Sequence, residues 1–295
     1  MYFTRNNNYF HGIMFHHFYD NKLHIKSQGA ISKDDFFNLI KFVGRKNILN
    51  ADEFIFRYKE NKLTNKDLCL TFDDGLNCQY DIALPILEDF KIKSFFFVYS
   101  SIFTQKPDLG EIYRYFRTKY FKNINDFYNN FFALCKKNLD HFFDDKKNLI
   151  KKLKLIYPFY SIADIKFRLV RNNILNYNEY KNLMFKMFYQ KKFDPKNFYK
   201  ILFLSKKNLK KIKDLGHIVG LHSHTHPIML ERMNYDSQLK EYTKNQTIIS
   251  KITKCKQIIS MSHPFGSYNK NTLKILENLD LEIGFRAIMG KDGSV

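Results

Sequence analysis

Short apolar runs alternate with amphipathic segments in this sequence, and this alternation constrains the fold more than any other feature. The apolar runs at 12–18, 67–72 and 94–99 are typical of buried strands. Between the first two, residues 31–43 have apolar residues at helical spacing behind Ser32, a residue type that caps helices. A strand–helix–strand order implies parallel strands, because the helix carries the chain back along the sheet. We therefore predict an α/β fold.

The alternation stops over residues 104–204 and then resumes. This stretch is rich in Phe, Tyr, Lys and Asn, and its apolar residues recur at helical spacing. A helix that begins behind Ser205 follows it, and further strand and helix patterns come after that helix. We predict one barrel domain formed by residues 1–103 and 205–295, interrupted by a helical insertion at 104–204.

The chain is strongly basic. Its 295 residues include 49 Lys and Arg but only 29 Asp and Glu, which gives a formal net charge of +20. Such a field attracts anions. We expect a phosphate-bearing substrate, and the charge alone would allow peripheral contact with an anionic membrane surface. The alternative is an ordinary solvated basic surface. Nucleic acid is not expected as a partner, because no nucleic-acid-binding motif accompanies the charge. The sequence shows neither a signal peptide nor a run of about 20 apolar residues, so we expect a cytoplasmic protein. Its oligomeric state does not follow from the sequence.

Two adjacent carboxylates, Asp73 and Asp74, follow the apolar run that ends at Phe72. Adjacent carboxylates repel each other unless a metal ion or a proton neutralises one of them. The carboxyl end of a strand is also where α/β proteins place their ligands. The alternative is a turn in which an Asp side chain bonds the backbone before the next helix. This motif alone leaves both alternatives open.

Three of the ten histidines, His222, His224 and His226, lie within five residues. Imidazole nitrogens are good ligands for zinc and similar ions. His222 and His226 are four residues apart, so a single turn places them on the same side, whereas His224 points elsewhere. The alternative is a polar loop with chance histidines. Two histidines and one carboxylate beside an open position are typical of a catalytic metal site, and we predict that His222, His226 and Asp74 bind one divalent ion, with zinc the expected metal.

Asp73 would then lie beside the metal as a base, and such a site hydrolyses amides or esters. A third motif, SHPFGSY at 262–268, has a Pro followed two positions later by a Gly. This pattern predicts either a plain turn or a rigid loop whose exposed N–H groups suit a developing oxyanion.

The motifs TFDDG, HSHTHP and SHPFGSYN, in this order, resemble the successive motifs of the polysaccharide deacetylase family, the NodB-type carbohydrate esterases. The resemblance covers about residues 1–103 and 205–290. It implies a distorted (β/α) barrel, the same base and metal ligands, and the backbone N–H of Phe265 as oxyanion donor. The reaction that it implies is removal of an acetyl or similar acyl group from an amino sugar.

Two departures from the family pattern concern the base and the general acid. Family members often have Arg where this chain has Ser262, and often have a C-terminal segment whose His is the acid, whereas no His follows His263. We therefore seek the acid among His263, His16 and His17. We prefer His17, because it lies nearer the carboxyl end of the first predicted strand and because neighbouring strand residues point to opposite sides.

Taken together, these motifs predict a cytoplasmic, metal-dependent deacetylase that acts on a nucleotide- or lipid-linked precursor of a surface glycan. The alternative is a catalytically degenerate family member that binds a glycan or its precursor. The missing Arg and the missing C-terminal His favour this alternative, whereas the intact carboxylate pair and histidine pair favour the enzyme.

Overall fold

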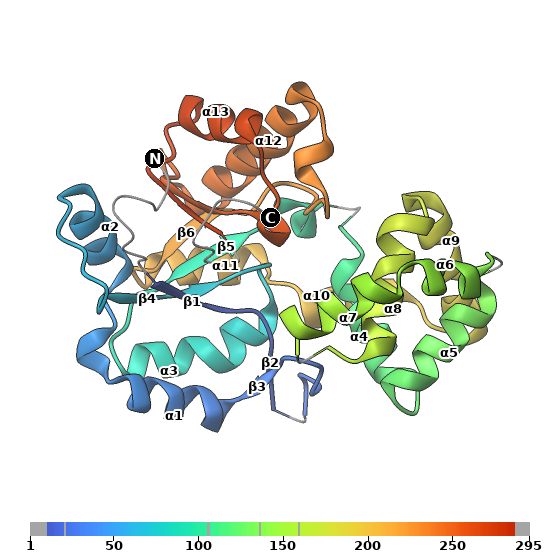
Figure 1. Ribbon diagram of the computed structural model, residues 1–295. Helices are drawn as coiled ribbons and strands as arrows, with labels where there is room; N and C mark the ends of the chain where they lie inside the picture. Colours follow the sequence, from blue (N-terminus) through green and yellow to red (C-terminus); the bar gives the residue numbers. More distant parts are fainter. Residues whose placement is uncertain (1–10, 21, 105–106, 136, 159, 287–295) are drawn as a thin grey trace. The chain divides into compact units, whose positions relative to one another are not determined.

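The structure is a computed structural model, and it describes residues 11–20, 22–104, 107–135, 137–158 and 160–286 (Figure 1). The chain forms two compact units. The first unit comprises Met1–Asp108 and Tyr199–Val295, and the second comprises Leu109–Phe198.

A six-stranded sheet in which all neighbouring strands are parallel forms the centre of the first unit. Its strands lie in the order β1 (His11–Phe15), β4 (Leu68–Phe72), β5 (Phe95–Val98), β6 (Ile218–Leu221), β7 (Ser260–Ser262) and β8 (Ile283–Phe285). Strands that follow one another in the chain are therefore neighbours in space, which is the order of a (β/α) barrel. The predicted fold class, a distorted (β/α) barrel with a helical insertion, is confirmed. A separate parallel pair consists of β2 (Phe18–Tyr19) and β3 (Ile31–Ser32).

Helices cover the sheet of the first unit, with α1 and α3 along one side and α12 and α13 along the other (Figure 1). The helices of this unit are α1 (Lys33–Val43), α2 (Ala51–Lys59), α3 (Leu84–Asp89), α10 (Tyr199–Leu202), α11 (Lys206–Asp214), α12 (Tyr235–Thr253) and α13 (Lys270–Asn278). The helix caps predicted at Ser32 and Ser205 are present. The Ser32 hydroxyl accepts the N–H of Asp35, and the Ser205 hydroxyl accepts the N–H of Asn208, which satisfies backbone donors that each helix leaves without a partner.

An aromatic core fixes the strand that carries the two carboxylates. The Phe72 ring, fully buried in β4, stacks on Phe96 with centroids 4.7 Å apart. Phe36 of α1 lies edge-on to Phe15, with centroids 5.0 Å apart. Each such buried side chain stabilises the fold by about 1.5–3 kcal/mol, and the packing holds the carboxyl ends of β1 and β4 in place.

The first strand is shorter than predicted. The sequence predicts a strand over 12–18, but β1 ends at Phe15, which pairs with Phe72. His16 and His17 therefore lie beyond the strand, where the alternation of side chains across a sheet no longer applies. Their rings stack with centroids 5.8 Å apart and an interplanar angle of 25°, so the prediction that they point to opposite sides is wrong.

The second unit is helical and has its own aromatic core. Its helices are α4 (Gly110–Lys119), α5 (Ile124–Leu134), α6 (Leu139–Asp145), α7 (Lys147–Ile156), α8 (Ile162–Leu169) and α9 (Tyr177–Gln190). Phe131 of α5 lies edge-on to Phe167 of α8, with centroids 4.8 Å apart, and Phe188 of α9 lies 4.7 Å from Phe116 of α4. Nowhere in the described parts of the chain is a helix both long and apolar enough to cross a membrane.

Candidate metal centre and catalytic site

Three predicted ligands converge on one point at the carboxyl ends of the strands. Asp74 follows β4, and His222 and His226 follow β6. Oδ1 of Asp74 lies 3.3 Å from Nε2 of His222 and 3.1 Å from Nε2 of His226, and the two Nε2 atoms are 3.2 Å apart. Ligands in a tetrahedral site with bonds of about 2.0–2.1 Å are separated by about 3.3–3.4 Å. These donor atoms therefore fit a single zinc-sized ion.

The carboxylate of Asp74 is held in its ionised form. Burial by itself would raise its pKa, but His226, His16 and His222 outweigh that effect and hold the pKa well below its usual range. The group thus offers the anionic oxygen that a divalent metal binds.

His222 is oriented by its second ring nitrogen. Nδ1 lies 2.8 Å from the carbonyl oxygen of Ser262, and because a carbonyl can only accept, Nδ1 carries the hydrogen and Nε2 keeps its lone pair. The N–H of His222 also donates to Oδ1 of Asn245, 2.9 Å away. The contact of Nδ1 fixes the ring in the tautomer that a metal ligand requires, and the contact of the N–H holds the backbone of His222.

Asp73 has one oxygen held and one open. Its N–H donates to the carbonyl of Phe15, and its Oδ2 accepts a hydrogen bond of 2.9 Å from the hydroxyl of Ser262. Within the described residues, its buried Oδ1 has no hydrogen-bond partner. A carboxylate with a fixed orientation and a lone pair available is suited to accept a proton.

Phe265 lies in a short 3₁₀ helix, Pro264–Gly266, after β7. Its ring centroid is 4.7 Å from that of His226, which places the residue beside the predicted metal ligands. The role of its N–H as oxyanion donor stays a prediction.

The three candidate acids differ in their surroundings. Nε2 of His16 lies 3.8 Å from Oδ2 of Asp74, and a ring nitrogen of His17 lies within 4.8 Å of a carboxylate oxygen of Asp74. His263 is buried, and burial together with His222 and Arg286 lowers its pKa to about 3. His263 is therefore neutral near pH 7 and has no proton to give as an imidazolium.

The family model of the polysaccharide deacetylases matches residues 60–115 and 164–284, more than half of the chain. The chain belongs to the polysaccharide deacetylase family. A search of the curated proteins gave no match.

Solved structures of deacetylases share the fold. The deacetylase PplD of Streptococcus pyogenes, described in complex with acetate, is 17% identical, with a TM-score of 0.53 over 95% of this chain and 84% of that one. IcaB from Ammonifex degensii is 14% identical, with a TM-score of 0.53 over 95% and 91%. A de-N-acetylase from Aggregatibacter actinomycetemcomitans is 13% identical, with a TM-score of 0.52 over 97% of both chains.

Two buried polar residues of α12 support the histidine motif of this member of the polysaccharide deacetylase family, and the sequence analysis missed both. Glu241 accepts the backbone N–H of His224 and of Thr225 at 2.8 and 2.7 Å, and Asn245 bridges the N–H of His222 to the carbonyl of Val98. The sequence feature that could have identified these two residues is their spacing. Residues four apart share a helix face, and polar residues on a face that packs against the sheet require polar partners.

His224 itself is turned away from the predicted metal ligands. Its Nδ1 lies 2.9 Å from the hydroxyl of Ser100. Burial lowers its pKa, with Lys244 adding to the effect and Glu241 opposing it. The ring of His224 thus stabilises the loop. It is not one of the three side chains that converge as candidate ligands.

The backbone around the predicted site is strained. Asp74, His226 and Phe265 adopt positive φ angles of 77°, 56° and 53°, a conformation that costs non-glycine residues about 1–3 kcal/mol each. Gly75 also has a positive φ, and a Cβ added there would lie 2.7 Å from the side chain of Val98. Such strain is typical of functional sites, and Gly75 allows the chain to turn directly behind the carboxylate pair.

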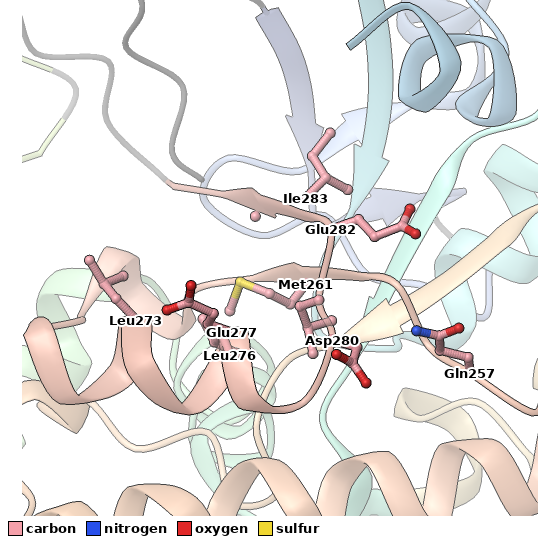
Figure 2. Close-up of a pocket in the computed structure, with 10 residues that line it drawn as sticks. Gln257, Met261, Leu273, Leu276, Glu277, Asp280, Glu282 and Ile283 are labelled. Carbon is pink, nitrogen blue, oxygen red and sulfur yellow. The ribbon is translucent and has the colours of Figure 1, made fainter. Parts of the chain in front are cut away.

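A pocket of about 470 Å³ lies away from these residues, at the amino ends of β7 and β8 and beside α13 (Figure 2). It is lined by Gln257, Met261, Leu273, Leu276, Glu277, Asp280, Leu281, Glu282, Ile283 and Gly284. None of the predicted site residues lines it, because those residues follow the carboxyl ends of their strands.

Proposed function

We propose that this chain is a metal-dependent hydrolase that removes an acetyl group from an N-acetylated amino sugar. The chain belongs to the polysaccharide deacetylase family, and one observation of its structure supports the proposal. Oδ1 of Asp74 and Nε2 of His222 and His226 lie within 3.1–3.3 Å of one another. Zinc is the proposed metal, because two imidazoles and one carboxylate leave a tetrahedral ion one open position.

Each residue has a role that follows from its surroundings. When bound, a divalent ion polarises the acyl carbonyl and lowers the pKa of water. Asp73 accepts the proton of the attacking water at Oδ1, the oxygen that no hydrogen bond occupies among the described residues. The N–H of Phe265 donates to the oxyanion, and His17 or His16 protonates the leaving amine. Water thus adds an oxygen to the acyl carbon while the carbon–nitrogen bond breaks.

The proposed substrate is a nucleotide- or lipid-linked sugar, a precursor of a surface glycan, handled in the cytoplasm. The net charge of +20 supports a substrate that bears phosphate. Acetate release from a panel of nucleotide-linked N-acetyl sugars, with zinc added or chelated, tests both the reaction and the metal. Asp73→Asn is the matched control, because it should keep the metal and lower the rate by about 10²–10⁴-fold.

The competing proposal is a degenerate family member that binds a glycan without hydrolysing it. Ser262 at the position of the family's Arg favours it. The same panel separates the two functions. Binding of a sugar with no acetate release at any metal concentration would support the binding protein and exclude the hydrolase.

A further inference from the structure

Helix α7 of the second unit has one buried face and one face open to solvent. Ile150 is buried against Ile165 and Leu169 of the helix that follows. Five exposed residues of this helix form what we call the α7 surface. They are Lys147, Lys151, Lys152, Leu155 and Ile156.

The α7 surface concentrates exposed aliphatic side chains. Leu155 is 82% exposed and Ile156 is 52% exposed, and Leu149 and Ile162 nearby are also exposed. These residues are four of the six exposed Leu and Ile side chains in the described parts of the chain. Single exposed apolar residues are normal on a protein surface, but a cluster of them marks an interaction site.

The same surface carries unneutralised positive charge. The sequence has five lysines between Asp145 and Asp164 and no acidic residue between them. Among the described residues, no carboxylate pairs with Lys147, Lys151 or Lys152. Leu155 lies between Lys151 and Lys152 around the helix, because residues three and four apart share a face.

The turn after α7 is held in place by another lysine. Nζ of Lys154 donates to the carbonyl oxygens of Pro158 and Tyr160, at 2.6 and 2.7 Å. These contacts fold Lys154 back onto the protein and anchor the end of α7. The exposed Leu155 and Ile156 therefore project from a fixed backbone rather than from a loose loop.

We propose that the α7 surface binds anionic lipid bilayers peripherally. A bilayer surface has a headgroup region and, beneath it, an acyl region. The lysines of such a helix attract anionic headgroups, and its exposed aliphatic side chains enter the boundary of the acyl region. A polynucleotide offers phosphates to the lysines but no apolar layer to Leu155 and Ile156. The combination of charge and apolar exposure therefore favours a bilayer.

The test is sedimentation of the full chain with vesicles of phosphatidylcholine alone or mixed with phosphatidylglycerol. Wild-type protein should sediment with the anionic vesicles and be released by salt. Lys151→Gln/Lys152→Gln should lower the partition coefficient roughly 30-fold, about fivefold for each lysine. Leu155→Asn/Ile156→Asn should lower it by about tenfold at unchanged charge.

Matched controls come from the first unit. Lys206→Gln/Lys207→Gln on α11 removes the same charge, and Phe42→Asn on α1 removes a side chain that is 92% exposed. Both controls should keep wild-type partitioning. All of these residues are exposed, so circular dichroism should show unfolding free energies within about 0.5 kcal/mol of wild type.

Two results would overturn the inference. One is equal binding of wild type and both α7 variants to anionic vesicles. The other is binding of polynucleotide in preference to vesicles, lost with the two lysines but unaffected by Leu155→Asn/Ile156→Asn, which would identify a general polyanion site.

Discussion

The hydroxyl of Ser262 donates a 2.9 Å hydrogen bond to Oδ2 of Asp73, while the carbonyl oxygen of the same residue accepts Nδ1–H of His222 at 2.8 Å. One residue thus orients both the proposed base and a proposed metal ligand. It does so at the position where the polysaccharide deacetylase pattern often has an Arg.

Ser262→Ala should separate these two contacts. The variant keeps the backbone carbonyl, so zinc content should be unchanged. It loses a hydrogen bond to a buried carboxylate, a contact of about 1.5–3 kcal/mol, so kcat for acetate release should fall about 10–100-fold. Ser260→Ala is the control, because within the described residues the hydroxyl of Ser260 has no hydrogen-bond partner. Equal activity of Ser262→Ala and wild type would show that Asp73 needs no such support.

Replacement of any ligand should abolish stable metal binding. Asp74→Ala, His222→Ala and His226→Ala each leave two donors of three, so zinc measured after dialysis should fall from about one ion per chain to near zero. In wild type, zinc at 100 times its Kd should add about 2.7 kcal/mol to the unfolding free energy. His224→Ala should keep the ion, and equal loss there would show that the ligand pair is wrong.

The fold class followed from the sequence because local patterns agree with the barrel. Apolar runs mark the buried strands, and Ser32 and Ser205 cap the helices where predicted. The end of β1 did not follow, because Phe18 continues the apolar pattern beyond Phe15 although it belongs to β2. Only the pairing with β4 sets that end.

The sequence predicted the three side chains that converge at the site, but it did not predict the residues that support them. Asp74, His222 and His226 belong to short motifs whose spacing suggests coordination, and the structure brings them together. Glu241 and Asn245 lie on an ordinary helix pattern, and their partners are backbone amides whose positions depend on tertiary packing. The local sequence of such a helix does not predict which loop its polar side chains contact.

Glu241→Gln should loosen the histidine loop. The carboxylate accepts two backbone N–H groups and the hydroxyl of Thr225, and loss of its charge weakens all three bonds. Supporting contacts of this kind typically change metal affinity by about 10–100-fold, measurable by zinc titration. Asp236→Asn, an exposed acid on the same helix, should leave the affinity unchanged. Equal affinity in Glu241→Gln would limit Glu241 to a role in folding.

The general acid should be one of the two stacked histidines. An imidazolium loses its proton as pH rises, so activity that depends on it declines at alkaline pH. His17→Ala should remove this alkaline limb and lower kcat by about 10²–10⁴-fold with zinc retained. His16→Ala is the comparison. If only His16→Ala loses the alkaline limb, the acid is His16. If neither variant loses it, both histidines are excluded as the acid.

Stability at acid pH should depend on His217, which is buried at the amino end of β6, whereas His222 follows the carboxyl end of the same strand. Its Nδ1 accepts the N–H of Ser94 at 3.1 Å, and its Nε2 lies 3.1 Å from a carboxylate oxygen of Glu88. Burial, with Lys93 adding to the effect, lowers its pKa to about 4 despite Glu88. The folded chain therefore resists protonation at a pH where the unfolded chain, with a His pKa of about 6.5, already binds a proton.

This difference in pKa sets the direction of the pH dependence. The contribution of His217 is fully present above about pH 6.5, and it is lost as pH falls toward 4, by on the order of 3 kcal/mol in total. Urea unfolding at a series of pH values, followed by circular dichroism, should show a smaller acid loss for His217→Gln, which stays neutral, than for wild type. His141→Gln, at an exposed histidine, should keep the wild-type slope. If His217→Gln also kept that slope, protonation of His217 would not be what destabilises the chain in acid.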